Sequence, residues 1–278
     1  MTIRSPRPSW LVAAAGLLAL VGSIAAPITV AAPMTTQTAQ AATAAPTTVQ
    51  SAMNSTLLTE INSDRATLGL RALRLDNRLV GLAAERAVEM AATDQLAHVT
   101  EIGAAERSVG VAPFLAGEAI GETNTTCGVT SATYIYGLWR NSPEHWGLIT
   151  SNVFNYIGIG VAYQQAGGQT FAALDFAEEA DITPPISAFT SVRRSGTTVS
   201  FTWGASDPLL QTHTAGLRDF QVAYRVDGGT WRTLWSATKR LGITLANRPK
   251  GHTYSIEIRS RDWRNNVSAW VIRSVRVS

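Results

Sequence analysis

The sequence predicts an α+β domain followed by an all-β sandwich, and three observations support this prediction. Apolar residues recur at helical spacing over 55–69, 79–91 and 129–140, and two apolar runs typical of strands follow them. Beyond residue 182 the chain shows strand-like alternation and no helical pattern. Pro184 and Pro185 separate the two regions, because each fixes the backbone and removes a donor. We therefore expect one domain over 51–181 and a second over 182–278.

The first fifty residues are typical of an export leader. Two arginines precede an uncharged apolar run over 11–25, and an Ala-x-Ala sequence lies at residues 39–41. We expect a signal peptide and leader over 1–41 and a flexible, uncharged lead-in over 42–50. The alternative is a retained membrane anchor, but the apolar run is short for a stable span. The sequence therefore predicts a secreted, extracellular protein, and a place at the cell surface is compatible with it.

The exported chain contains a single cysteine, Cys127. Without an internal disulfide, both domains must be stabilised by burial of apolar side chains. A small, partly buried residue is the simpler interpretation of Cys127, and a reactive thiol is the alternative.

Four helices are expected in the first domain, taken in chain order. The first covers 55–69 and ends at Gly69, a good C-cap. Asp76 offers a cap for the second, which brings these residues to one face: Leu79, Leu82, Ala83, Arg86, Ala87, Met90 and Ala91. The third covers 129–140. Pro143 opens a short fourth helix with His145 on its first turn.

Strands are expected at the end of the first domain and throughout the second. Residues 156–163 and 170–176 form a hairpin with two glycines in its turn. The second domain alternates with period two in five runs: 198–203, 220–226, 241–245, 254–259 and 269–277. Strands at such short spacing favour a β-sandwich.

The two domains differ in the sign of their net charge. Residues 51–181 hold 7 Arg and 15 acidic residues, whereas 182–278 hold 14 Lys or Arg and 5 acidic residues. The basic domain also contains five tryptophans, so an anionic cell-wall polymer or glycan is a candidate partner. The alternative is a solvated arginine surface over a tryptophan-rich core. A nucleic-acid partner is not expected, since the chain is exported and has no recognition helix.

Two histidines and a glutamate are the candidate functional residues of the first domain. His98 follows the second helix, Glu118 follows Gly117, and His145 lies in the sequence Ser142-Pro143-Glu144-His145. Imidazoles bind divalent metals and exchange protons near neutral pH. The chain has no His-Glu-x-x-His helix, and Ser142 lacks the Gly-x-Ser-x-Gly context of serine hydrolases. Whether the three residues meet in space decides the functional interpretation.

Residues 51–178 resemble the bacterial, SCP-like branch of the CAP superfamily. The likeness rests on four blocks in order: His98, Gly117-Glu118-Ala119-Ile120, Trp139-x-x-Ser142-Pro143-x-His145, and the strand sequence from Ile157 to Phe176. The resemblance implies an α-β-α sandwich with a shared cleft. In it His98 and His145 would be ligands of a divalent metal, zinc being one choice, and Glu118 the neighbouring acid. Leu96-Ala97, Ala119 and Trp146 depart from the family pattern, which weakens an argument for catalysis.

Residues 182–278 resemble a fibronectin type III module, which implies an immunoglobulin-like sandwich. Trp203 fits its buried aromatic residue, and Pro249 to Tyr254 resembles its tyrosine corner. We therefore expect a metal-binding cleft that takes a small extracellular ligand without fast turnover, joined to a spacer or adhesion module. The alternative is a metal-dependent hydrolase of extracellular peptides or lipids with Glu118 as general base, and a third interpretation is a vestigial cleft.

Overall fold

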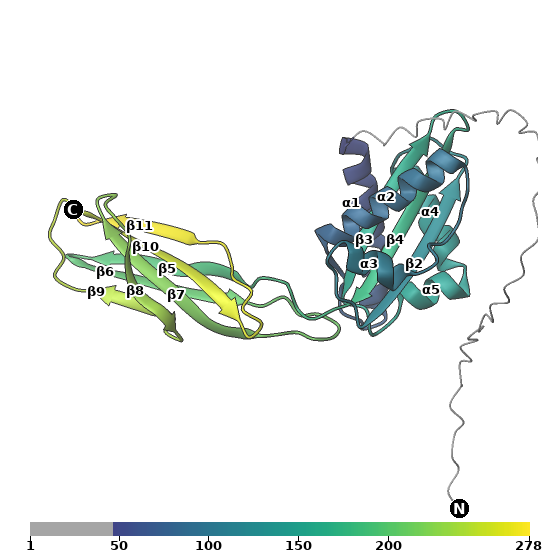
Figure 1. The fold of residues 1–278 in the computed structure, drawn as a ribbon. Helices are drawn as coiled ribbons and strands as arrows, with labels where there is room; N and C mark the ends of the chain where they lie inside the picture. Colours follow the sequence, from purple (N-terminus) through teal and green to yellow (C-terminus); the bar gives the residue numbers. More distant parts are fainter. Residues whose placement is uncertain (1–46) are drawn as a thin grey trace, which may run out of the picture. The chain divides into compact units, whose positions relative to one another are not determined.

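The computed structural model describes residues 47–278, in which an α+β domain precedes a β-sandwich (Figure 1). The leader predicted over 1–41 and the first part of the lead-in predicted over 42–50 lie outside the described residues. Within residues 47–278, no helix is both long and apolar enough to cross a membrane. The predicted fold classes of both domains are confirmed.

Five helices belong to the first domain: α1 (Thr47–Thr67), α2 (Asn77–Thr93), α3 (Ile102–Ser108), α4 (Val129–Arg140) and α5 (Pro143–Ile149). Helix α1 begins eight residues before its predicted start, so residues 47–50, expected in the flexible lead-in, are helical. Helix α2 is capped as predicted, because the Asp76 side chain accepts a hydrogen bond from the Arg78 backbone N–H. Helices α4 and α5 begin at the predicted residues. Helix α3 was not predicted, since seven residues are too few to show a clear period.

A four-stranded sheet forms the middle layer, in the order β1-β3-β4-β2. Its strands are β1 (Arg74–Leu75), β2 (Leu115–Thr123), β3 (Tyr156–Gln164) and β4 (Gln169–Glu178). The hairpin of β3 and β4 was predicted. Strands β1 and β2 were not, because β1 has two residues and β2 lacks the alternation of a half-buried strand. Strand β2 is antiparallel to β4 and places Glu118 opposite Asp175.

Helices cover both faces of this sheet, which gives the α-β-α layers seen in Figure 1. On one face α1 and α4 bury a large apolar cluster that includes Leu57, Ile61, Ile135, Trp139, Ile159 and Leu174. On the other face α2 contributes small residues, among them Ala83, Ala87 and Ala91, which pack on Ile120 and Phe171. The small side chains allow the helix to lie close to the strands.

Two glycines of β3 set the distance between α2 and the sheet. A Cβ atom on Gly158 would lie 2.2 Å from the Leu79 carbonyl, and one on Gly160 would lie 2.1 Å from the Ala83 carbonyl carbon. Backbone atoms cannot move aside as a flexible side chain can. The Gly-x-Gly spacing of β3 is therefore required by the packing of α2, with one glycine beneath each helical turn.

The second domain is a sandwich of two sheets, ordered β11-β10-β7-β8 and β5-β6-β9. Its strands are β5 (Ile186–Ser195), β6 (Thr198–Ser206), β7 (Leu217–Val226), β8 (Arg232–Thr238), β9 (Gly242–Leu245), β10 (Thr253–Asp262) and β11 (Val271–Arg276). The core includes Phe201, Trp203, Val222, Tyr254 and Ile256, so Trp203 is buried as predicted. Strands β5 and β8 were not predicted, and both pair with their neighbours through register shifts that interrupt a period of two.

Candidate functional site

His98 and Glu118 lie in direct contact, as the sequence interpretation requires. The Nδ1 atom of His98 is 2.8 Å from Oε2 of Glu118, and the same oxygen accepts a 3.0 Å hydrogen bond from the Val99 N–H. The imidazole is 57% exposed, whereas the carboxylate is 3% exposed. A buried acid on the edge strand β2 therefore holds an exposed histidine of the loop after α2.

Arg86 completes the surroundings of this carboxylate. Its Nε donates to Oε1 of Glu118 at 3.1 Å, one terminal nitrogen donates to the Ala97 carbonyl at 2.7 Å, and the other contacts Glu89. Both oxygens of Glu118 therefore have partners. Arg86 was predicted only as a member of the core face of α2. The sequence did contain a signal for this ion pair, because a cation on an otherwise apolar helix face needs a buried acidic partner.

His145 is placed by the short helix α5. Ser142 caps this helix, with its side chain accepting a hydrogen bond from the His145 backbone N–H. Gly117 allows α5 to approach β2, because a Cβ there would lie 2.9 Å from the Leu148 side chain. His145 is half-buried, and burial, followed by the nearby charge of His98, lowers the pKa of its imidazole. The two histidines thus interact electrostatically although they are 47 positions apart in the chain.

The ring nitrogens of the two histidines differ in their partners. The Nδ1 atom of His98 faces Glu118, which leaves Nε2 on the opposite side of the ring. A histidine bound to a carboxylate through one nitrogen is the usual form of a metal-ligating histidine. Within residues 47–278, the ring nitrogens of His145 take part in no described hydrogen bond. Two histidines with water would form an open site.

An acidic group that could hold a metal ion lies elsewhere, at Asp181, Asp207 and Asp262, whose carboxylate oxygens lie within 4.8 Å of one another. It is the one group of three close metal-ligating side chains in the described part of the chain. Backbone N–H groups of Thr183, Ala215, Gly216, Arg264 and Asn266 donate to these carboxylates. The sequence interpretation missed this group, because its members are 26 and 55 positions apart and match no motif.

The same domain contains two further buried acids. Asp175, opposite Glu118 in the sheet, and Glu106 of α3 are fully buried, and none of their four carboxyl oxygens has a hydrogen-bond partner in the described residues. Burial raises the pKa of Asp175 to about 8, and the neighbouring charge of Glu118 acts in the same direction. Burial and then the charge of Asp175 raise the pKa of Glu106 to about 8. Both carboxyls therefore hold protons at neutral pH.

Comparison with known proteins agrees with this architecture. Residues 58–176 match the model of the CAP family, described as the cysteine-rich secretory protein family. A search of curated proteins gave no match.

Several solved structures are similar to parts of the chain. An outer surface protein from Borrelia burgdorferi is 18% identical over 46% of this chain and 92% of its own, with a TM-score of 0.41. An extracellular protein with an SCP domain from Bacillus anthracis is 19% identical over 54% of this chain and 45% of its own, with a TM-score of 0.41. A structure named FN3tt mut is 16% identical over 34% of this chain and 94% of its own, with a TM-score of 0.24. The match to the CAP family therefore covers residues 58–176, the part of the chain that holds His98, Glu118 and His145.

Proposed function

We propose that the first domain binds a divalent metal ion, zinc being the first choice, between His98 and His145. The observation that supports this most directly is the 2.8 Å contact between Nδ1 of His98 and Oε2 of Glu118. It fixes the ring and directs Nε2 outward, so Glu118 orients the ligand rather than binding the ion itself. Two imidazoles with water leave a coordination position for an oxygen atom of a small extracellular ligand.

The same contacts argue against a hydrolase. A general base needs a carboxylate oxygen that can reach the proton it removes. Both oxygens of Glu118 are already in contact with Arg86, His98 and the Val99 N–H. We therefore propose ligand binding without turnover, outside the cell, as the expected leader and the CAP family suggest.

Zinc titration of the full chain by calorimetry tests this proposal. Wild type is expected to bind zinc at micromolar concentration or tighter, and His98→Ala and His145→Ala should each weaken binding at least tenfold. Glu118→Gln should weaken zinc binding by about tenfold and by less than either histidine substitution, because it removes only an orienting contact.

Two controls separate this site from other zinc ligands of the chain. His252→Ala removes an exposed histidine that pairs with Asp227 in the β-sandwich and should leave zinc binding unchanged. Asp207→Asn alters the acidic group and should also leave it unchanged. Binding that survives both cleft substitutions, or that is lost only in Asp207→Asn, contradicts the proposal.

A further inference from the structure

A groove of about 200 Å³ lies on the outer face of the β11-β10-β7-β8 sheet. Its walls and floor include Trp231, Trp235, Trp270, Gln221, Glu257 and Arg259. Trp270 is 40% exposed, and Trp231 and Trp235 are half-buried. Trp235 also packs against the core of the sandwich, so Trp231 and Trp270 are the two indole rings that the groove presents most openly.

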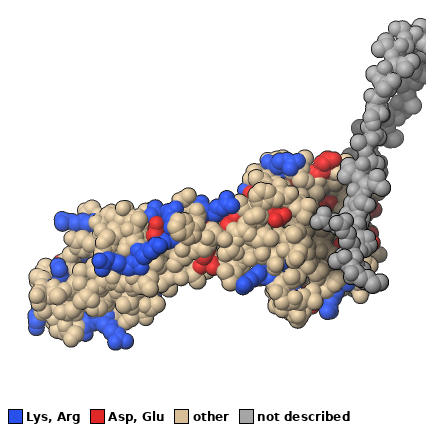
Figure 2. Space-filling view, turned by 90° about the horizontal axis from the view of Figure 1, so that it is seen from below, with Lys and Arg blue, Asp and Glu red and all other residues tan. Residues whose placement is uncertain are grey.

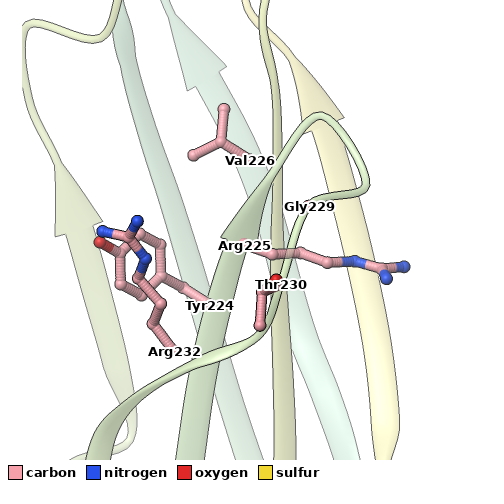
Figure 3. Close-up of a pocket in the computed structure, with 6 residues that line it drawn as sticks. All are labelled: Tyr224, Arg225, Val226, Gly229, Thr230 and Arg232. Atoms are coloured by element: carbon pink, nitrogen blue, oxygen red, sulfur yellow. The ribbon is translucent and has the colours of Figure 1, made fainter.

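Strand alternation explains why these side chains share one face. Val222 of β7 and Ile256 and Ile258 of β10 point into the core of the sandwich. The residues between them therefore point outward, and Glu257 lies opposite Ala223 while Arg259 lies opposite Gln221. Figure 3 shows the same alternation on β7, where Arg225 projects to one side of the strand and Tyr224 to the other, beside Arg232.

Arginines lie over all three tryptophans that line this groove, and Arg240 is the most distant of them, 5.5 Å from the ring centre of Trp235. The guanidinium of Arg259 lies 4.5 Å from the ring centre of Trp270, and that of Arg225 lies 4.4 Å from the ring centre of Trp231. These contacts hold both guanidinium groups in place without using their N–H groups. Arg259 donates only Nε, to Gln221, and Nε of Arg225 is buried without a partner in the described residues.

The groove therefore contains unused donors. Within residues 47–278, no described hydrogen bond is donated by the indole N–H of Trp231, Trp235 or Trp270, whereas buried Trp203 donates to the Arg240 carbonyl. The one acid of the groove, Glu257, lies in the charge field of both Arg225 and Arg259. Arginines thus outnumber the one acid locally, and Figure 2 shows basic side chains spread over the sandwich on the visible face.

We propose that this groove binds a segment of an acidic polysaccharide. A sugar ring has apolar C–H faces that suit an indole and hydroxyl groups that accept from indole N–H and guanidinium donors. Its carboxylate group is held by Arg225 or Arg259, since a guanidinium binds a carboxylate through paired hydrogen bonds. This inference concerns the sandwich alone and stands independently of the histidine site.

Binding of three probes to the full chain tests the inference. An oligogalacturonate supplies sugar rings with carboxylates, its methyl ester supplies the same rings without charge, and inorganic polyphosphate supplies charge without rings. We expect the full chain to bind oligogalacturonate at least tenfold more tightly than either of the other two. Trp270→Ala and Arg259→Gln should each weaken that binding at least tenfold. Arg259→Gln is the variant to rely on if Trp270→Ala lowers the melting temperature.

Matched controls come from the same domain. Trp263 is 62% exposed and takes no part in a described cation–π contact, so Trp263→Ala should leave the affinity unchanged. Arg273→Gln removes an exposed arginine of β11 outside the groove and should do the same. His98→Gln should also have no effect, which separates a failure here from a failure of the zinc proposal.

Several results would overturn the inference. Equal affinity for polyphosphate shows attraction by charge alone, and equal affinity for the methyl ester shows that the arginines do not select an anion. Tighter binding of a single-stranded oligonucleotide assigns the aromatic and basic residues to nucleic acid. No measurable binding of oligogalacturonate, or binding unchanged in the groove variants, removes the proposed site.

Discussion

Arg86 of α2 and Glu118 of β2 form a buried ion pair, with Nε 3.1 Å from Oε1 and side chains that are 10% and 3% exposed. Removing one member of such a pair leaves the other charge buried and uncompensated. Arg86→Met should therefore lower the free energy of unfolding by about 3 kcal/mol, measured by urea denaturation at pH 7. Arg74→Met removes an exposed arginine and should change it by less than about 0.5 kcal/mol. Equal effects of the two variants would show that the pair does not stabilise the domain.

The two histidines should influence each other's protonation. The nearby charge of His98 lowers the pKa of the His145 imidazole, after the larger effect of burial. Replacing His98 by Gln removes that charge, so the pKa of His145 should rise toward its ordinary value. The Cε1–H resonance of His145, followed by NMR from acidic to mildly alkaline pH in metal-free buffer, reports the change. His252→Gln serves as the control, and an unchanged His145 titration in His98→Gln would show that the two rings are too far apart to interact.

Asp175 should make the stability of the protein depend on pH. The folded state keeps this carboxyl protonated up to about pH 8, whereas the unfolded chain ionises it near its ordinary value of 3.8. Stability from this group is fully present below about pH 4 and is lost as pH rises to about 8. Between about pH 5 and pH 8, the free energy of unfolding should fall by about 2 to 4 kcal/mol less in Asp175→Asn than in wild type. Urea denaturation measures this difference.

The control for Asp175 is Asp94→Asn. Asp94 is exposed and has the left-handed backbone conformation that asparagine also accepts. This variant should follow the wild-type dependence on pH. If Asp175→Asn also follows it, the Asp175 carboxyl is ionised in the folded protein.

Substituting alanine for a glycine beneath α2 should change the free energy of unfolding in the opposite direction from the same substitution within that helix. Gly160→Ala places a Cβ 2.1 Å from the backbone of Ala83, so the helix must move away from the sheet. We expect a loss of about 3 kcal/mol or more in the free energy of unfolding. Gly81→Ala meets no atom within 4 Å and should stabilise α2 by roughly 0.5 to 1 kcal/mol. A mild effect of Gly160→Ala would show that the contact between α2 and β3 is loose.

The fold was predictable where one physical signal dominates a segment. Asp76 caps α2 and Pro143 opens α5 because these are local effects, and the sequence displays them directly. Strand β2 was not predictable in this way, since it is covered on both sides and its residues are small. The bulges beside Phe189 and Phe220 likewise shift the alternation on which strand prediction relies.

The site was predictable only in part. The resemblance to a family placed His98, Glu118 and His145 around one cleft, and in the structure His98 and Glu118 are in contact. Asp175 was visible only as one residue of a strand, although it lies opposite Glu118, whose charge contributes to its raised pKa. Such partners depend on which strands pair in the sheet, and the spacing of residues along the chain does not indicate that pairing.

The hydrogen bond between Glu118 and His98 affects the entropy of the proposed zinc binding. An exposed histidine normally samples several rotamers, and fixing one of them opposes binding by up to about 1 kcal/mol. His98 is 57% exposed, yet its ring is tied at Nδ1 to a carboxylate that is itself held by Arg86 and the Val99 N–H. The His98 ring is therefore already fixed before the proposed zinc ion binds. The residues that fix it do not contact the ion. Substitutions at Arg86 should weaken binding by loosening the ring rather than by removing a contact.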